Sequence, residues 1–163
     1  MRKKSKSNKK PFYPVNSPYI TKKDIDSVNK VLKSGWISSD GPEIKKFEEN
    51  FSRFIGRKYS VAVSSGTAAL EIAIKALNIK ENDEVLIPNF TIISNALAVI
   101  RQQAKPVLID CNLKDWNIKI EDIEKNISKK TKAIIITHIY SFPNEMQKIL
   151  KICKKYNLLV IED

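Results

Sequence analysis

The sequence is short of the residues that build metal centres and disulfide frameworks. Its 163 residues contain two cysteines, one histidine and four glycines. Cys111 and Cys153 lie far apart, without a CxxC pair or a Cys/His cluster, which argues against a zinc site and for a reducing compartment. We therefore expect a cytoplasmic protein without a bound metal.

Long apolar runs are also lacking, and the 18 acidic residues are fewer than the 29 basic ones. No apolar run is long enough to span a bilayer, and no apolar segment follows the basic N-terminus as in a secretory signal, so no membrane partner is expected. The formal net charge is +11, but six basic residues lie within the first ten positions, and removing these six from +11 leaves +5. The other lysines are mixed with acids and not interleaved with aromatic residues, so a nucleic-acid-binding module is a weak alternative.

The rest of the chain has the pattern of a packed α/β domain. Strands and helices alternate from residue 59 onward, and the strands are rich in Val and Ile without polar alternation, which predicts a mostly parallel sheet sandwiched by helices. The predicted strands are Tyr59–Val63, Glu84–Ile87, Pro106–Asp110, Ala133–Thr137 and Leu158–Glu162. The predicted helices among them are Thr67–Leu77, Ile92–Arg101, Ile120–Ile127 and Asn144–Tyr156.

The first part of the chain has a different pattern. Met1–Lys10 has no apolar residue after the first position and is predicted to be disordered. Two amphipathic helices follow, of which the first begins with a capping-box variant formed by Thr21 and Asp24. Pro42 suits the first position of the second helix.

The stretch from Val61 to Leu70 predicts a strand that stops at a small-residue turn and enters a helix. Such a helix N-terminus presents free backbone N–H groups and a partial positive charge, which suit a phosphate. Gly66 lets the backbone come close to a ligand, and Thr67 adds a hydroxyl group. The alternative is an ordinary strand-to-helix turn that is capped by Ser65.

Polar residues follow the ends of several predicted strands, where ligands of parallel α/β sheets bind. The residues expected to share one site are Ser64–Thr67, Pro88–Thr91, His138–Tyr140 and Asp163. Asp163 follows a buried strand, and its carboxylate needs a partner. That partner is either the protonated pyridine nitrogen of a cofactor or, more simply, a helix N-terminus or a surface ion pair. His138, the only histidine, is more often structural than catalytic in such a position.

Four segments together resemble one protein family. They are Val61–Leu70, Pro88–Ser94, Thr137–Tyr140 and Val160–Asp163. Their order and spacing resemble the DegT/DnrJ/EryC1/StrS sugar-nucleotide aminotransferases, above all the perosamine-synthase-like members, from about residue 14 to the last residue. The resemblance implies the first half of a type I, aspartate-aminotransferase-like fold with an incomplete large domain. Residues 1–13 would form a disordered basic tail, 14–57 an N-terminal helical arm and 58–163 the first part of the cofactor-binding large domain.

The resemblance also implies pyridoxal 5′-phosphate (PLP) as cofactor. Gly66, Thr67 and Ala68 match the turn that binds the cofactor phosphate, and Asp163 matches the partner of the ring nitrogen. Ile92 lies where many members have an aromatic residue stacked on the ring, so an apolar contact would replace the stacking. The lysine that forms the Schiff base is expected beyond Asp163, since no lysine of this chain has a matching context.

One further departure from the family pattern is Ser141, which follows Tyr140 where glycine is usual. Because a glycine at this position is able to adopt a positive φ, the conformation of the loop is in question.

By the resemblance, the complete protein would convert a keto nucleotide-sugar to an amino sugar for polysaccharide or glycan biosynthesis, as a GDP-4-keto-6-deoxymannose 4-aminotransferase does. Glutamate is the expected amino donor and a homodimer the expected assembly.

Two alternatives stay open: a PLP-dependent sugar dehydratase, in which histidine replaces the lysine, and a catalytically inactive short product. In the family the first large-domain strand pairs with a strand from later in the sequence, so these 163 residues alone are expected to be poorly stable.

Overall fold

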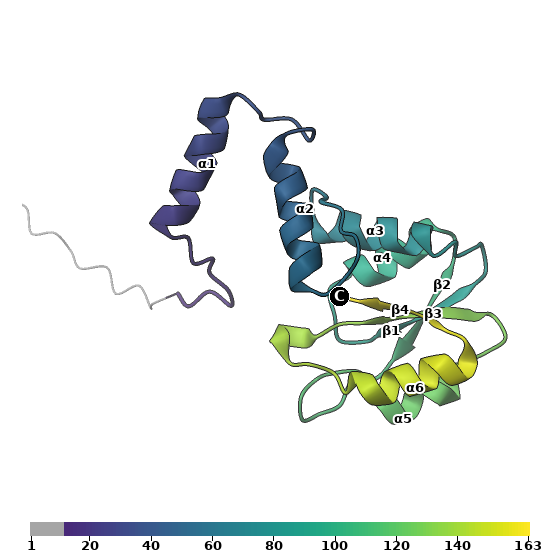
Figure 1. Ribbon diagram of the computed structural model, residues 1–163. Coiled ribbons are helices and arrows are strands. Elements are labelled where there is room, and N and C mark those ends of the chain that lie inside the picture. Colours follow the sequence, from purple (N-terminus) through teal and green to yellow (C-terminus); the bar gives the residue numbers. More distant parts are fainter. Residues whose placement is uncertain (1–11) are drawn as a thin grey trace, which may run out of the picture. The chain divides into compact units, whose positions relative to one another are not determined.

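The computed structural model describes residues 12–163, so the tail predicted at Met1–Lys10 lies outside the described residues. The chain divides into two compact units, with the boundary between Ala62 and Val63. Each unit is built from its own elements (Figure 1).

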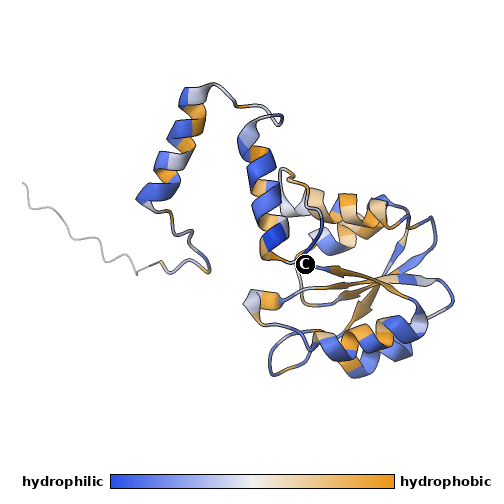
Figure 2. Ribbon diagram, in the orientation of Figure 1, coloured by the Kyte–Doolittle hydropathy of each residue, from blue (hydrophilic) through white to orange (hydrophobic). Residues whose placement is uncertain are grey.

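The first unit contains two amphipathic helices, α1 (Lys22–Ser34) and α2 (Pro42–Phe54). The predicted capping box is present at α1: the Thr21 hydroxyl accepts the backbone N–H of Asp24 at 3.3 Å, and the Asp24 carboxylate accepts the backbone N–H of Thr21 at 2.7 Å. Hydrogen bonds from the hydroxyl and the backbone N–H of Thr21 lower the pKa of the Asp24 carboxyl group. Neither helix has a buried residue, and Figure 2 shows apolar residues along both.

The second unit is a parallel four-stranded sheet between two layers of helices, as predicted (Figure 1). The strand order is β2-β1-β3-β4, and every neighbouring pair is parallel. Helices α3 and α4 cover one face, and α5 and α6 cover the other. The strands are β1 (Glu84–Pro88), β2 (Lys105–Ile109), β3 (Thr131–Ile136) and β4 (Leu159–Glu162). The helices are α3 (Gly66–Ala76), α4 (Ser94–Arg101), α5 (Ile120–Ile123) and α6 (Met146–Tyr156), with 3₁₀ turns η1 (Glu124–Asn126) and η2 (Ile139–Ser141).

Successive residues of the central strands fill two separate cores. Ile135 of β3 packs with residues of α3 and α4, whereas Ile134 and Ile136 pack with residues of α5 and α6. All three side chains are fully buried. Cys153 of α6 lies in the second core, where burial raises the pKa of its thiol. Since both faces of the sheet are covered, the central strands need apolar side chains at every position, which explains their lack of polar alternation.

The prediction of a strand at Tyr59–Val63 is wrong. The segment has no regular structure, and the residues Tyr59 and Val61 are 75% and 74% exposed. The backbone N–H of Ala62 donates instead to the side-chain carboxylate of Glu48 in α2, at 2.8 Å. A strand is held by hydrogen bonds to a neighbouring strand, and no strand within residues 12–163 pairs with this segment. The apolar composition therefore suggested a strand for which these residues supply no pairing partner.

Candidate functional site

The candidate site lies at the carboxyl edge of the sheet in the second unit. Thr91, Thr137 and Asp163 follow the ends of β1, β3 and β4 at this edge. The backbone of Asp163 extends the pairing of β3 with β4, because its N–H donates to the carbonyl of Ile136 at 2.8 Å and its carbonyl accepts the N–H of His138 at 3.0 Å. Polar residues from three strand ends therefore lie together at this edge, and their side chains lie on both faces of the sheet.

Four polar side chains form a hydrogen-bonded group, which we call the threonine network, on the face covered by α3 and α4. The Nδ2 atom of Asn95 lies 2.8 Å from the hydroxyl oxygens of both Thr91 and Thr137, and these two oxygens are 3.0 Å apart. The Thr137 hydroxyl donates to Oδ2 of Asp163 at 3.3 Å. Asn95 is fully buried and Asp163 is exposed, so the network leads from the interior to the surface.

The N-terminus of α3 lies on the same face, where the Thr67 hydroxyl is 2.9 Å from the hydroxyl of Ser94 at the start of α4. Ser65 caps α3, since its hydroxyl accepts the backbone N–H of Ala68 at 3.2 Å. The N–H groups of Gly66 and Thr67 have no hydrogen-bond partner within residues 12–163. A Cβ atom on Gly66 would meet no atom of another segment within 4 Å, so the space where a side chain would lie is open. The turn is thus both a serine-capped helix start and an open pair of donors, which suits an anion.

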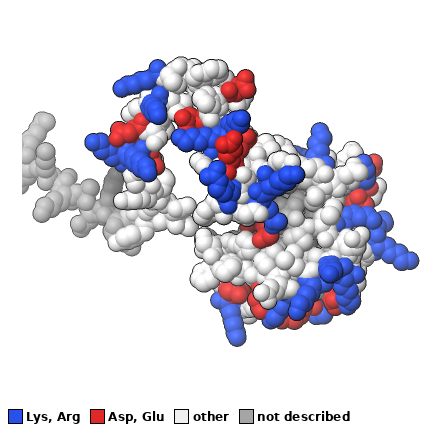
Figure 3. Space-filling view, in the orientation of Figure 1, with Lys and Arg blue, Asp and Glu red and all other residues white. Residues whose placement is uncertain are grey.

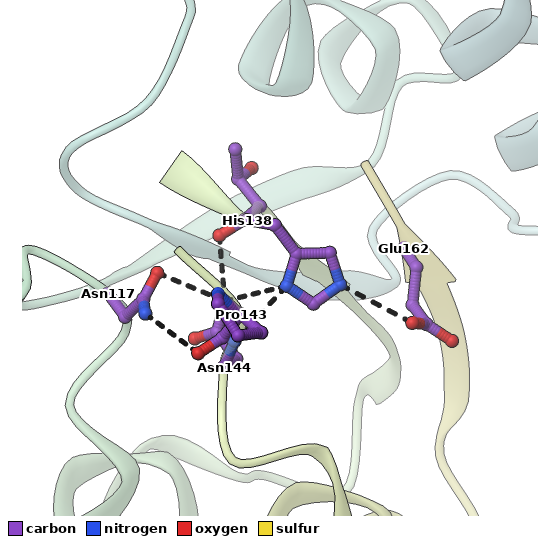
Figure 4. Close-up of polar contacts among 6 residues, drawn as sticks. Asn117, His138, Pro143, Asn144 and Glu162 are labelled. Carbon is purple, nitrogen blue, oxygen red and sulfur yellow. Dashed lines mark hydrogen bonds and ion pairs between the residues drawn. The ribbon is translucent and has the colours of Figure 1, made fainter. Parts of the chain in front are cut away.

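A second group, which we call the histidine network, lies on the opposite face between β3 and α6 (Figure 4). The backbone N–H of Asn144 donates to Nδ1 of His138 at 3.2 Å, which leaves the proton of the neutral ring on Nε2, 3.4 Å from the Glu162 carboxylate. The side-chain amide of Asn144 donates to the Thr137 carbonyl at 2.8 Å and to Oδ1 of Asn117 at 3.2 Å. The imidazole is therefore held between two segments, on the side of the sheet away from the threonine network.

The prediction of the site from sequence missed Asn95 and Thr137. Thr137 lies two positions after Ile135, and Asp163 lies two positions after Ile161, and both isoleucines pack against the core beneath α3 and α4. Because side chains alternate along a strand, this spacing could have placed Thr137 and Asp163 on one face and His138 on the other. No sequence pattern predicts that Asn95 contacts Thr91 and Thr137, since these contacts depend on how α4 lies on the sheet.

Two residues that depart from the family pattern also lie at this edge. Ile92 precedes α4, and this residue is 63% exposed. Ser141 has a φ of 67° and Tyr140 a φ of 46°, so both adopt the left-handed conformation that favours glycine. The loop therefore has a positive φ at Ser141 although the residue is serine.

Charges on the second unit are mixed and partly paired. Hydrogen bonds from Lys125 and Lys119 lower the pKa of the Asp122 carboxyl group, with N–O distances of 2.6 and 3.2 Å. Figure 3 shows acidic groups among the basic ones on the face in view.

Within the part of the chain that the structure describes, no three His, Cys, Asp or Glu side chains are arranged to hold a metal ion. None of the helices described in residues 12–163 has both the length and the apolar character needed to cross a membrane.

Sequence comparison identifies one family. The model of the DegT/DnrJ/EryC1/StrS aminotransferase family matches residues 18–163. Over 152 residues the chain is 41% identical to the GDP-perosamine synthase of Escherichia coli O157:H7, in a match that covers 93% of this chain and 42% of that protein.

Solved structures of similar proteins confirm the predicted type I PLP fold. The aminotransferase from Psychrobacter cryohalolentis superposes with a TM-score of 0.84 at 35% sequence identity, covering 94% of this chain and 38% of the other. A GDP-4-keto-6-deoxymannose-3-dehydratase with a trapped PLP-glutamate geminal diamine gives a TM-score of 0.85 at 26% identity, covering 93% of this chain and 40% of the other. The chain therefore spans about two fifths of the length of these proteins and contains part of their fold.

Proposed function

The chain belongs to the DegT/DnrJ/EryC1/StrS aminotransferase family, and we propose that the complete protein uses PLP to transfer an amino group to a keto nucleotide-sugar. Members of this family have been solved with PLP or with the amino form of the cofactor, pyridoxamine phosphate (PMP). One observation carries the proposal: the open N-terminus of α3 and the Asp163 carboxylate lie on the same face of the sheet edge.

The N-terminus of α3 fits the phosphate of this cofactor. Gly66 has neither a positive φ nor a crowded Cβ position, so neither its backbone conformation nor its packing requires glycine. Its lack of a side chain does leave the N–H groups of Gly66 and Thr67 open to an anion. In the proposal these two N–H groups and the hydroxyl of Thr67 hold the phosphate, and Ala68, whose N–H donates to the Ser65 hydroxyl, completes the turn.

The Asp163 carboxylate fits the ring nitrogen. Its Oδ2 accepts the Thr137 hydroxyl, and Oδ1 has no partner within residues 12–163. An ionised carboxylate at this position would hold a protonated pyridine nitrogen by a charge-assisted hydrogen bond. When bound, PLP supplies an electron sink for the negative charge that forms as a proton leaves the carbon beside the amino group. Ile92, exposed before α4, would cover the ring by an apolar contact.

The catalytic lysine is proposed to lie later in the complete protein than Asp163. The lysines of this chain have no matching context. Its 163 residues would therefore bind and orient the cofactor without performing the transfer. The proposed substrate is GDP-4-keto-6-deoxymannose, which the 41% identity to a GDP-perosamine synthase supports. Glutamate as amino donor is supported by the dehydratase solved with a PLP-glutamate adduct.

A cytoplasmic homodimer is the proposed form of the complete protein. Three aromatic residues, Trp116, Tyr140 and Phe142, are between 52% and 69% exposed and line a hollow of about 240 Å³ together with Lys114 and Asp115. Exposed aromatic residues in such a group are typical of surfaces that a partner covers. This surface adjoins η2, which follows β3 at the same edge as the candidate site.

A PLP-dependent sugar dehydratase is the second candidate, since such an enzyme superposes on this chain as well as the aminotransferase does, with TM-scores of 0.85 and 0.84. The test is to incubate the full-length protein with PLP, GDP-4-keto-6-deoxymannose and glutamate that carries an isotopic label on its nitrogen. An aminotransferase leaves the labelled nitrogen on the sugar, which mass spectrometry detects. A product that lacks a hydroxyl group and carries no label would support the dehydratase, and a wild-type protein that binds neither PLP nor PMP would contradict both.

A further inference from the structure

We propose that Thr137 is a positioning residue, which holds the Asp163 carboxylate in the orientation needed by the ring nitrogen and is itself oriented by the buried amide of Asn95. The inference rests on the proposed function, since it assigns a role to Thr137 toward the same cofactor. It concerns two residues that the site predicted from sequence did not include: Thr137, which follows β3, and Asn95 in α4.

The geometry sets the direction of the hydrogen bonds. An amide nitrogen only donates and an ionised carboxylate only accepts. The Thr137 oxygen therefore accepts from Nδ2 of Asn95 at 2.8 Å, and its own hydrogen points to Oδ2 of Asp163 at 3.3 Å. The oxygen of Thr91, 3.0 Å from that of Thr137, also accepts from Asn95, so its hydrogen is directed to Thr137. Every hydroxyl hydrogen of the network is thereby directed toward the carboxylate.

The backbone of Asp163 is fixed by the same strand. Its N–H donates to the Ile136 carbonyl at 2.8 Å, and its carbonyl accepts the N–H of His138 at 3.0 Å. Residues around the end of β3 thus hold Asp163 in two ways. Ile136 and His138, on either side of Thr137, bind the backbone of Asp163, and Thr137 binds its carboxylate. With Oδ2 occupied in this way, Oδ1 is the carboxylate oxygen available to a ligand.

Asn95 shows that the network is not explained by stability alone. Its side chain is fully buried, and its Oδ1 has no hydrogen-bond partner among the described residues. A buried, unpaired amide oxygen lowers stability, and an apolar residue of similar size would avoid this loss. The amide is useful at this position because its two N–H groups orient the Thr91 hydroxyl toward Thr137 and the Thr137 hydroxyl toward the surface carboxylate.

The experiment measures the binding of PMP to the full-length protein freed of cofactor. PMP has the phosphate and the ring nitrogen of PLP but forms no bond with the catalytic lysine, so its Kd reports the contacts of the phosphate and the ring. A hydrogen bond to a charged group is strong enough that Thr137→Val should raise the Kd about tenfold or more. Thr137→Ser keeps the hydroxyl and should remain within about threefold of wild type.

The matched control is Thr131→Val, the same change at the other end of β3. The Thr131 hydroxyl accepts the N–H of Ser128 at 2.9 Å, far along the strand from the carboxyl edge. This variant should lower the thermal unfolding midpoint of the cofactor-free protein and leave the Kd of PMP unchanged.

Asn95→Leu is a second test, because it keeps the Thr137 hydroxyl but removes the amide that orients this hydroxyl. We expect a Kd raised by about threefold without a lower unfolding midpoint.

The outcomes separate the two proposals. A wild-type protein that does not bind PMP contradicts the proposed function. If the wild type binds PMP, a Thr137→Val Kd within twofold of wild type overturns the inference, and so does a Thr137→Ser variant as weak as Thr137→Val. If Thr137→Val does not fold, Asn95→Leu decides: a folded variant with an unchanged Kd overturns the inference, and a raised Kd supports it.

Discussion

The two polar networks at the carboxyl edge of the sheet lie back to back on its two faces and differ in how they end. In the histidine network both ring nitrogens of His138 have partners, and the Asn144 amide donates to groups from two other segments. The threonine network ends instead at a carboxylate with a free oxygen, and it contains a buried amide oxygen without a partner among residues 12–163. A network whose groups satisfy one another holds loops in place, whereas one that ends with unused groups at the surface is suited to a ligand.

This difference separates His138 from Asp163, which look alike as single polar residues at strand ends. Their backbones are hydrogen-bonded at 3.0 Å, yet their side chains belong to different networks. The comparison predicts that changes in the histidine network alter stability without affecting the cofactor. Changes in the threonine network and at the start of α3 should weaken cofactor binding with little effect on stability.

The largest expected effect is the loss of stability in Asn144→Ala. Asn144 is only 8% exposed, and its removal leaves the Thr137 carbonyl and Oδ1 of Asn117 without a donor. We expect the free energy of unfolding in urea to fall by about 2–3 kcal/mol. The Kd of PMP should stay within twofold of wild type. Asn126→Ala, at an exposed site with one local hydrogen bond, is the control and should cost less than about 1 kcal/mol. A large loss of PMP affinity in Asn144→Ala would show that the two networks are not independent.

Asp163→Asn tests the open end of the threonine network. The change keeps the size of the side chain and removes the negative charge, so we expect the Kd of PMP to rise about thirtyfold with little change in stability. The matched control is Glu162→Gln, the same change one residue earlier and on the opposite face. Its Kd should remain within threefold of wild type. Equal effects of the two variants would contradict the assignment of Asp163 to the ring nitrogen.

Gly66→Val tests the open space at the start of α3. Since a Cβ at this position meets no atom within 4 Å, the cofactor-free protein should keep its unfolding midpoint. The added side chain should block the N–H groups and weaken PMP binding about tenfold. Gly66→Ala should give an intermediate Kd, and binding that is unchanged in both variants would place the phosphate elsewhere.

The smallest expected effect is a gain of stability in Ser141→Gly. Serine at a φ of 67° is in the left-handed conformation, and glycine relieves this strain at the cost of a more flexible unfolded chain. We expect the free energy of unfolding to rise by about 0.5–1 kcal/mol. Ser64→Gly, at a residue without a positive φ, is the control and should not stabilise the protein. A loss of stability in Ser141→Gly would mean that the serine side chain contributes contacts that outweigh the strain.

The α/β class, the parallel sheet, the helix caps and the family could all be predicted from the amino-acid sequence alone. These features depend on local patterns: Val-rich and Ile-rich strands without polar alternation, the capping box of Thr21 and Asp24, and motifs at fixed spacing. The turn at Gly66 and the strand-end carboxylate at Asp163 belong to the same class of local signals.

The neighbours of these residues, in contrast, could be learned only from the folded structure. Tyr59–Val63 has the composition of a strand but no partner within residues 12–163, and pairing rather than composition makes a strand. Thr137 and Asn95 are 42 positions apart and meet only because of the way α4 packs on the sheet. The reason is physical: a local pattern fixes the conformation of a segment, whereas contacts across the fold depend on how the segments are packed together.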